Sequence, residues 1–202
     1  MTESTAQPTE VRSFIAVDLP SEVRERVLAA AVSLAPALPD VDIRWSSKVE
    51  NLHVTLKFLG NVAVGRLDQL GQALVARLGA VPPFSIGVRG FGAFPSLREA
   101  SIIWAGVEDR QQHLARVAAI VDDVAAAHGF VPEERAFRGH VTVGRARERA
   151  HVDVRQALQS LTEQAFGEVV VSEVSIYESR LGREGSTYVL RCRAPLGDRG
   201  RM

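Results

Sequence analysis

The sequence predicts an α+β protein with largely antiparallel sheets. Short segments rich in β-branched and aromatic residues alternate with helical patterns in mixed order. Two pairs of neighbouring segments, within residues 84–107 and 169–193, have the character of hairpins. A tripeptide that occurs in two of the expected strands further suggests two similarly built halves.

Each expected element has a local signal. The helical patterns cover residues 21–34, 67–78, 111–128 and 152–161. The pattern in 111–128 is the clearest, because its apolar residues fall on one face and Gly129 stands where a C-terminal cap belongs. The expected strands are 13–19, 52–59, 84–91, 101–107, 140–145, 169–177 and 187–193.

The two ends of the chain lack any periodicity. Residues 1–10 and 197–202 are polar and bury too little apolar surface to offset their ordering entropy, so we expect flexible ends. Residues 11–196 are then expected to form a single domain. The glycines of residues 87–92 lie inside a strand pattern with no helix behind it, which argues against a phosphate-binding loop.

Composition excludes several classes of protein. The 24 Lys and Arg balance 24 Asp and Glu, which argues against non-specific coating of nucleic acid and requires any RNA to meet a local positive patch. Cys192 is the one cysteine, so disulfide scaffolds and cysteine-based zinc sites are excluded, and a reducing cytoplasm is the expected location. No apolar run approaches the ~18 residues of a membrane span, and no export signal is recognisable.

One short motif occurs twice, as His53-Val54-Thr55 and His140-Val141-Thr142. Two such matches arise by chance in roughly one sequence in a hundred of this composition. Side chains alternate along a strand, so each His shares a polar face with its Thr while the valines face the core. Two similar halves would place the two pairs on opposite walls of a cleft.

This arrangement suits in-line displacement at phosphorus. One imidazole can take a proton from the attacking oxygen while the other gives a proton to the leaving oxygen. The two Thr hydroxyls can donate hydrogen bonds to the non-bridging oxygens, where negative charge develops. The chemistry requires no metal and no cofactor.

Simpler interpretations of the motif remain open. A single His-Val-Thr is most often a β-rich segment with a polar outer face. A zinc site needs three protein ligands, and neither histidine is followed by a second ligand at the usual spacing. The other histidines, His113, His128 and His151, are expected at the surface or at helix ends.

With these residues in view, the sequence resembles the two-histidine phosphoesterases, and among them the RNA 2′,3′-cyclic phosphodiesterases historically called 2′-5′ RNA ligases. The resemblance extends over residues 12–20, 43–45, 50–60, 137–145 and 178–181, and it includes Tyr188. Two departures are visible, because Gly139 and Val49 stand where family members usually or often carry Pro. Gly139 is expected to loosen the entry to the second His-Val-Thr strand.

The resemblance implies a bilobal fold with a pseudo-twofold axis and a central cleft. It also implies hydrolysis of a terminal 2′,3′-cyclic phosphate to the 2′-phosphomonoester, with weak reverse joining of RNA ends through a 2′-5′ bond in some members. By this analogy His53 is the general acid on the leaving 3′-oxygen, and His140 is the base that activates water. The implied partners are RNA 3′ ends or small nucleotides bearing a cyclic phosphate, and no protein partner is indicated.

Two further residues follow by position. Arg145 would hold the phosphate or the incoming water, and Phe58 would stack on the terminal base. Each lies five residues after its histidine, so a straight strand would place it on the opposite face, and a bend near Gly60 or Gly144 is required. Alternatively, Arg145 is a solvated charge and Phe58 a core residue. A positive rim is expected from Arg44, Trp45, Lys57 and Arg138, each of which could equally be an ordinary surface or edge residue.

Other functions are open to the same residues. The nearest is hydrolysis of a small cyclic phosphate such as ADP-ribose 1″,2″-cyclic phosphate. A nucleotide-binding or RNA-binding module without turnover is a second possibility, although mere binding does not need an acid and base pair. A zinc hydrolase using His53 and His140 is a third.

Overall fold

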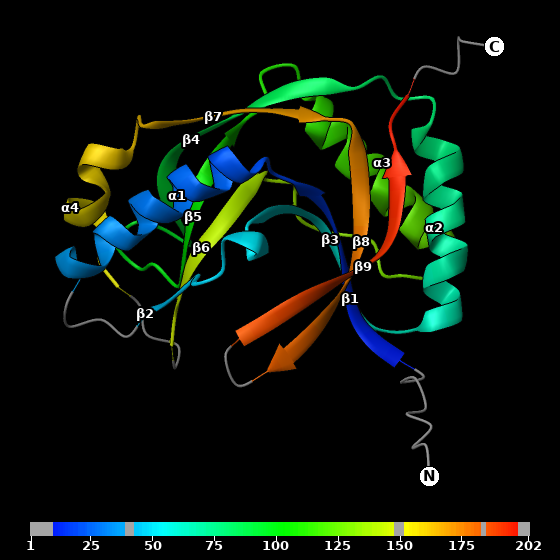
Figure 1. Ribbon diagram of the computed structural model, residues 1–202, viewed down its shortest axis with the longest axis horizontal. Helices are drawn as coiled ribbons and strands as arrows, with labels where there is room; N and C mark the ends of the chain where they lie inside the picture. The colour runs from blue at the N-terminus through cyan, green and yellow to red at the C-terminus, as the bar shows by residue number, and fades with distance from the viewer. Residues whose placement is uncertain (1–9, 39–42, 148–151, 183–184, 198–202) are drawn as a thin grey trace.

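A single curled sheet forms the centre of the computed structural model, which describes residues 10–38, 43–147, 152–182 and 185–197 (Figure 1). In this part of the chain nine strands join in the order β7-β4-β5-β6-β3-β1-β8-β9, with β2 paired to β6, and the pairings are antiparallel. The strands are β1 (Glu10–Asp18), β2 (Ile43–Trp45), β3 (His53–Ala63), β4 (Phe84–Phe94), β5 (Ile102–Glu108), β6 (His140–Ala146), β7 (Ala165–Val171), β8 (Glu173–Gly182) and β9 (Gly185–Pro195).

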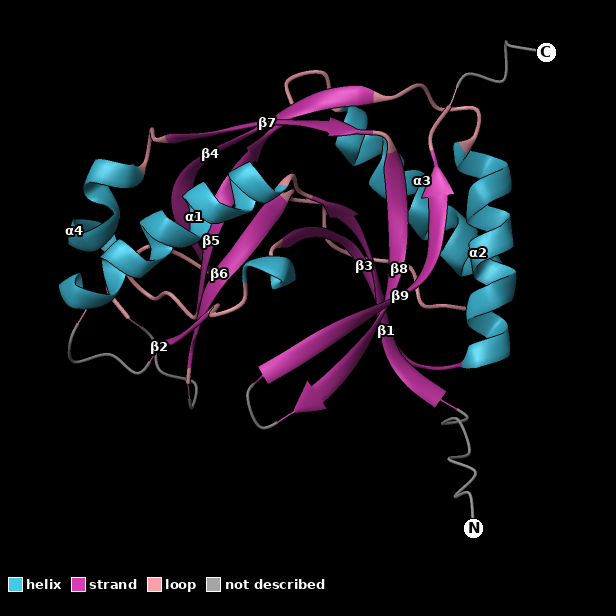
Figure 2. Cartoon of the chain, viewed as in Figure 1, coloured by secondary structure: helices cyan, strands magenta, loops and turns pink. Residues whose placement is uncertain are grey.

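The strand order divides the molecule into two related lobes. Strands β3 and β6 meet in the middle, and three further strands follow on each side, β1-β8-β9 beside β3 and β5-β4-β7 beside β6. Helix α1 (Ser21–Leu34) packs on β7 and β6, whereas α2 (Val64–Leu78) packs on β9 and against α3 (His113–Ala127) (Figure 2). The short helix α4 (Arg155–Leu158) precedes β7. The α+β class and the two-lobed antiparallel architecture predicted from the sequence are confirmed.

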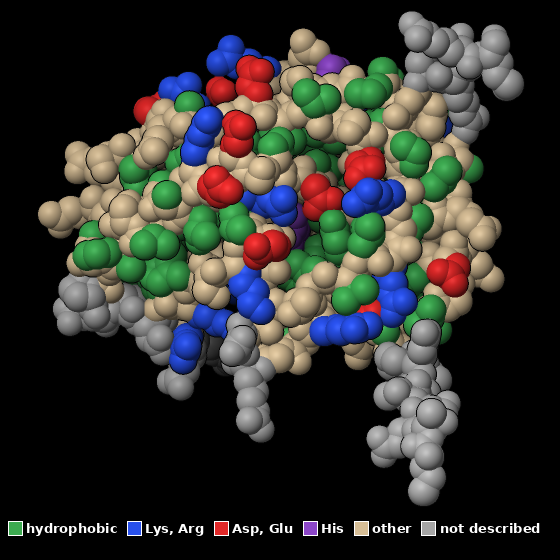
Figure 3. Space-filling model, in the orientation of Figure 1, with side chains coloured by type: hydrophobic (Ala, Val, Ile, Leu, Met, Phe, Trp, Pro, Cys, Tyr) green, Lys and Arg blue, Asp and Glu red, His purple; other side chains and the backbone are tan. Residues whose placement is uncertain are grey.

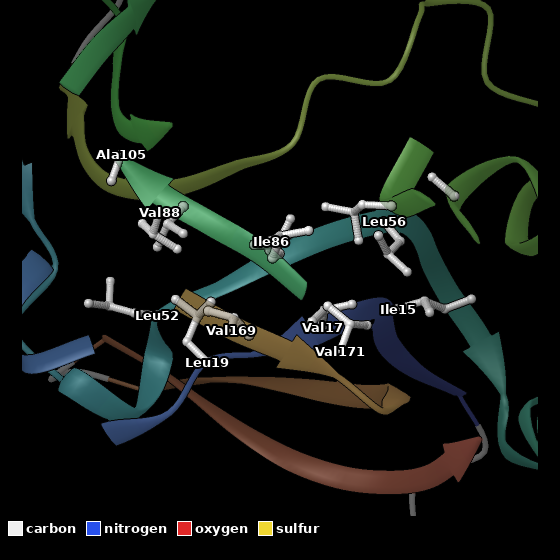
Figure 4. Packing of buried hydrophobic residues seen from close by; sticks show 14 of the residues in the cluster. Ile15, Val17, Leu19, Leu52, Leu56, Ile86, Val88, Ala105, Val169 and Val171 are labelled. Atoms are coloured by element: carbon white, nitrogen blue, oxygen red, sulfur yellow. The ribbon is translucent and has the colours of Figure 1, made fainter. Parts of the chain in front are cut away.

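The two lobes share one hydrophobic core. The sheet curls so that apolar side chains of β4 and β7 in one lobe point toward those of β1 and β3 in the other (Figure 4). Helix α2 contributes a stripe with helical spacing, and Gly71 in that stripe lets β9 approach closely, because a Cβ there would lie 2.8 Å from Cys192 Sγ. The labelled core residues in this view include Ile15, Val17, Leu56, Ile86, Val169 and Val171.

Most predicted elements are present with shifted ends. The helix predicted at 111–128 is α3, followed by Gly129 at φ +77°, the left-handed conformation of a C-terminal cap. The strand predicted at 169–177 is wrong, because Ser172 separates β7 from β8, which pair with different neighbours. The helix predicted at 152–161 shrinks to α4 and a 3₁₀ turn, and three-residue β2 was not predicted.

Both ends of the expected domain are held by backbone hydrogen bonds. Of the segments expected to be flexible, residues 1–9 and 198–202 lie outside the described residues. Glu10, expected in the flexible end, instead begins β1 and pairs with Ala63, because β3 runs far enough to offer a partner. At the other end the backbone N–H of Gly197 donates to the carbonyl of Val81 at 2.9 Å.

Candidate active site

The two His-Val-Thr segments lie side by side at the centre of the sheet. Strands β3 and β6 pair antiparallel with Val54 opposite Val141, and both valines are fully buried in the core. This register sets His53 across from Thr142 and Thr55 across from His140, on the face opposite the valines. Each imidazole therefore faces the hydroxyl-bearing residue of the other lobe.

The odd offset of Phe58 from His53 is resolved by a bulge. Along the β1–β3 ladder Ala16 pairs with Thr55 and Ile15 with Lys57, so Leu56 is left without a partner on β1. Leu56 and Lys57 are consequently both buried, and Phe58 returns to the face of His53 with 60% of its surface exposed.

The same irregularity occurs at the equivalent place in the other lobe. Along the β5–β6 ladder Trp104 pairs with Thr142 and Ile103 with Gly144, so Val143 is skipped, and Arg145 comes to the face of His140. The bend required by the sequence is present in both strands. In β6 it lies beside Gly144 as expected. In β3 the bulge that turns Phe58 lies at Leu56, and a second skipped residue, Leu59, lies beside Gly60 but after Phe58.

A cleft of about 1220 Å³ opens over this face, between β2 and the β8–β9 hairpin. It is lined by His53, Thr55, Phe58, Thr142 and Arg145, whereas the half-buried His140 lies beside Thr142 and Arg145 on β6 but is not itself among the lining residues. Its described lining also carries no carboxylate and four further cations, which are Arg12, Arg44, Lys48 and Arg147. Figure 3 shows that Lys and Arg side chains, in blue, gather along the lower part of the molecule.

Two arginines of the cleft lining lie directly opposite each other on neighbouring strands. Arg44 of β2 pairs with Arg145 of β6, and no ion pair between described residues involves either one. Like charges directly opposite on neighbouring strands repel each other. An anion between the two guanidinium groups would remove this repulsion, so the cleft is built to receive a negatively charged group in a protein without net charge.

His53 is enclosed by aromatic rings. Phe14 stacks on the imidazole with 4.7 Å between ring centroids, and Tyr188 meets it edge-on at 5.2 Å. This burial lowers the pKa of His53 from 6.5 to about 4, against opposing contributions from a hydrogen bond with the Asn51 backbone and from the Asp18 carboxylate. Without a ligand, His53 is therefore neutral near pH 7.

His140 has a matching environment in the other lobe. Phe94 meets the ring edge-on at 5.1 Å, and Nδ1 lies 2.7 Å from the carbonyl oxygen of Arg138. Burial lowers the pKa of His140, with a smaller contribution in the same direction from Arg145. When Nδ1 donates to that carbonyl, Nε2 is left as the proton acceptor.

The carboxylate of Asp18 is held firmly beside His53. Asp18 pairs with His53 in the β1–β3 ladder and accepts hydrogen bonds from Tyr177 Oη at 2.8 Å and from Ser175 Oγ at 3.1 Å. Burial and the bond to Asp18 together raise the pKa of Tyr177 to about 12. Tyr177 thus remains a donor at all physiological pH values, and the Asp18 charge is fixed in place.

Comparison with known proteins agrees with this geometry. The sequence model of LigT-like phosphoesterases matches residues 17–104 and 106–188. This chain belongs to the LigT-like phosphoesterase family. The RNA 2′,3′-cyclic phosphodiesterase of Methanothermobacter thermautotrophicus is 34% identical over 180 residues, which cover 89% of this chain and 95% of that protein. The protein of the same name from Archaeoglobus fulgidus is 32% identical over 180 residues, 88% of this chain and 96% of its own.

Solved structures of the family show the same fold. Escherichia coli LigT complexed with 3′-AMP superposes with a TM-score of 0.70 at 27% identity, over 93% of this chain and 98% of that one. The TT0787 protein of Thermus thermophilus gives a TM-score of 0.71 at 26% identity, over 93% and 99% of the two chains. The resemblance inferred from the sequence and the prediction of an enzyme are both confirmed, and the enzyme is a phosphoesterase.

The expected positive rim of this phosphoesterase is only partly where the sequence placed it. Arg44 and Trp45 line the cleft, but Lys57 does not, because the bulge turns its side chain into the protein. Arg138 is exposed away from the cleft lining and acts on His140 through its carbonyl oxygen. Gly139 is tightly packed, since a Cβ there would lie 3.2 Å from Val107 Cβ and 3.3 Å from Leu114 Cδ2.

Several residues around the site were missed by sequence reasoning. Lys48 lies in a polar stretch without a motif. Arg12 and Asp18 belong to the resembling segment 12–20, where no role was given to them, and Phe94 becomes relevant only once the sheet forms. Phe14, on β1 beside β3, was the available signal for the surroundings of His53, whereas Phe94 lies on β4, which β5 separates from β6. Tyr188, noted only as part of the closing hairpin, contacts both Phe14 and His53.

The remaining histidines lie apart from the cleft lining. His128 Nδ1 contacts the Val124 carbonyl oxygen at 2.8 Å at the end of α3, and His113 meets Phe84 edge-on at 5.3 Å. His151 lies outside the described residues. Within the described ranges, no three His, Cys, Asp or Glu side chains gather closely enough to hold a metal ion, and no helix is long and apolar enough to cross a membrane.

Proposed function

We propose that this phosphoesterase hydrolyses the terminal 2′,3′-cyclic phosphate of RNA to a 2′-phosphate by acid and base catalysis from His53 and His140. The observation that carries the proposal is the pairing of Val54 with Val141, which brings the two His-Val-Thr segments together beside a cationic cleft lined by His53, Thr55 and Thr142. The relatives from Methanothermobacter and Archaeoglobus, both named RNA 2′,3′-cyclic phosphodiesterases, support the same substrate class.

The reaction follows from the positions of the side chains. Nε2 of His140 takes a proton from water, whose oxygen attacks phosphorus while the bond from phosphorus to the 3′-oxygen breaks. His53 gives its proton to that 3′-oxygen, which leaves the phosphate on the 2′-position. Thr55 and Thr142 donate hydrogen bonds to the non-bridging oxygens, and Arg145 binds the charge that builds on them.

The assignment of acid and base rests on the charges beside each ring. The Asp18 carboxylate favours the imidazolium form of His53, whereas no carboxylate among the described residues acts in this way on His140. The bound phosphate adds a negative charge close to both rings, and a nearby negative charge raises a histidine pKa. In the proposal, which follows the family resemblance in this assignment, the substrate phosphate offsets the burial that lowers the pKa of His53 to about 4, so that His53 acquires its proton with the substrate while His140 acts as the neutral base.

The dimensions of the cleft favour RNA over a single small nucleotide. A volume of about 1220 Å³ lies above the usual range of small-molecule pockets, roughly 300 to 1,000 Å³. Five cations exceed the charge of one cyclic phosphate, and the rings of Phe58 and Trp45 in the lining offer stacking surfaces. Replacing the attacking water by a 5′-hydroxyl would join two RNA ends through a 2′-5′ bond, as the weak second activity.

The test is incubation of the enzyme with a short RNA ending in a 2′,3′-cyclic phosphate. The position of the product phosphate is identified by ³¹P NMR, with the His140→Ala variant as the control. Exclusive formation of the 2′-phosphate supports the proposal. A 3′-phosphate product contradicts the assigned leaving group. Hydrolysis of ADP-ribose 1″,2″-cyclic phosphate without hydrolysis of RNA would establish the small-nucleotide alternative, and binding without turnover would establish a binding module.

A further inference from the structure

Lys57 occupies a buried position that the catalytic scheme does not use. Only 2% of the residue is exposed, although it lies in β3 between Thr55 and Phe58, both of which line the cleft. Its Nζ lies 2.5 Å from Asp122 Oδ1 and 2.8 Å from the carbonyl oxygen of Val131. Burying an ammonium group is costly unless it is paired and hydrogen-bonded, so these acceptors determine where the side chain goes.

The acceptors form a cluster between α3 and the segment that follows it. Asp122 also accepts hydrogen bonds from the backbone N–H of Glu133, at 3.2 and 3.3 Å to its two carboxylate oxygens. The Glu133 carboxylate itself lies 3.9 Å from Lys57 Nζ. The position of the ammonium site is therefore fixed by parts of the chain outside β3.

Alternation along β3 would by itself give the opposite arrangement. His53, Thr55 and Lys57 are each two residues apart and would lie on the same face of a regular strand. Such a strand would direct Lys57 into the cleft and Phe58 into the core. The hydrophobic effect favours that alternative, because it buries a phenyl ring and exposes an amine. The bulge at Leu56 reverses both placements. The hydrogen bonds of Lys57 with its buried acceptors are the polar interactions that oppose the regular register of β3.

We propose that Lys57 is a positioning residue, which holds the bulge at Leu56 by placing its ammonium in the Asp122 and Val131 cluster, and thereby keeps Phe58 on the cleft face as the platform for the terminal base. The proposal rests on the proposed function for the identity of the base. Lys57 has no counterpart in the other lobe, because the equivalent position on β6 is Gly144. This glycine packs under β2, where a Cβ would lie 3.0 Å from Ile43 Cγ2. Burial of a charged group is here a device that sets strand register.

The test uses Lys57→Met, which keeps the length of the side chain and removes the charge. Asp122→Asn is the second variant, because it keeps the shape of the acceptor and weakens the ion pair. Arg66→Met is the matched control: Arg66 also donates to a carbonyl oxygen near the end of α3, that of His128, but it lies on α2 and not on β3. Thermal melting verifies that each variant is folded.

The first readout does not depend on activity. Phe58 is replaced by 4-fluorophenylalanine, and the difference in its ¹⁹F shift between H₂O and D₂O reports exposure to solvent. The Lys57→Met variant is expected to lose this solvent shift, whereas the Arg66→Met control keeps it. An unchanged shift in both Lys57→Met and Asp122→Asn overturns the proposal, and so does failure of both variants to fold, because Lys57 would then serve general stability.

The second readout is selectivity for the base. Two substrates are compared: an RNA end with a terminal base, and the same end with an abasic terminal ribose cyclic phosphate. In Lys57→Met the ratio of kcat/KM for the first to kcat/KM for the second should fall by about 5- to 100-fold, the range expected for one base stacked on an aromatic ring. Phe58→Ala should give the same loss, and the double variant no more than either. Equal losses on both substrates would reject the positioning role. If the parent enzyme does not hydrolyse RNA cyclic phosphate, the proposed function fails while the ¹⁹F experiment still decides the role of Lys57.

Discussion

The burial of His53 makes a prediction about stability that is independent of any substrate. The folded protein holds this histidine at a pKa of about 4, whereas the unfolded chain holds it near 6.5. Between these pH values the unfolded state binds more protons, so the free energy of unfolding decreases as the pH falls from 6.5 to 4 and levels off below. At about 1.36 kcal/mol per pH unit, the loss from this group is about 3 kcal/mol by pH 4.

The assay is urea unfolding of the protein and of the His53→Gln variant between pH 7 and pH 4. The variant lacks the titrating group, so the parent should lose about 3 kcal/mol more than the variant over this range, and about 2 kcal/mol more by pH 5. Tyr188→Ala removes the ring that meets His53 edge-on and should reduce the difference by admitting water. Parallel pH curves for parent and His53→Gln would show that the ring is not held neutral by burial.

The lowered histidine pKa values also change the pH at which catalysis is expected to be fastest. A pair that needs one neutral and one protonated histidine gives a bell-shaped kcat/KM between the two pKa values of the free enzyme. The reference pKa of ~6.5 alone would place the maximum around pH 6 to 7.5. Burial lowers the pKa of both His53 and His140, so we now expect the maximum below pH 6.5.

The remaining predictions concern the catalytic groups. His53→Ala and His140→Ala should each lower kcat for RNA cyclic phosphate by ~10² to 10⁴ while the protein stays folded, and near-normal turnover in either would refute the two-histidine mechanism. Thr55→Val and Thr142→Val preserve the side-chain shape and should lower kcat by ~10 to 10³ each, and unchanged kinetics would leave them as strand formers. Arg145→Gln should raise KM and lower kcat together, with circular dichroism as the check on folding. Activity should survive exhaustive treatment with a chelator, and activity lost and then restored by zinc would support a metal hydrolase.

Sequence reasoning succeeded where the determinants are local. The His-Val-Thr segments were identified as strands with a polar and an apolar face, because alternation along a strand depends only on nearest neighbours. The odd offset of Phe58 and Arg145 correctly indicated that each strand must bend. An irregularity does lie beside Gly60, at Leu59, but the one that turns Phe58 lies at Leu56 and was not predicted, because it depends on how β1 pairs with β3 and Ala16 and Ile15 carry no signal of a skipped partner.

Sequence reasoning failed where a side chain finds partners far along the chain. Lys57 was expected on the positive rim because a lone lysine in a strand is usually solvated. Its acceptors, Asp122 and Val131, lie more than sixty residues away and meet it only through packing. The single strand expected at 169–177 failed for a similar reason, since β7 and β8 join opposite ends of the sheet and only tertiary structure separates them.

The two lobes are alike at the histidines and differ immediately beyond them. After each Thr one residue is skipped in the ladder and the next is buried, and the following side chain, Phe58 or Arg145, returns to the cleft. A symmetric pair of imidazoles cannot by itself orient a cyclic phosphate, since either ring could serve either oxygen. In the proposed reaction an aromatic ring on one side and a guanidinium on the other supply the missing direction, because a nucleotide end has a base on one side and charge on the other. The assignment of His53 to the leaving oxygen is therefore a consequence of Phe58 and Arg145 as much as of the histidines, and the buried Lys57 is part of what makes the two lobes unequal.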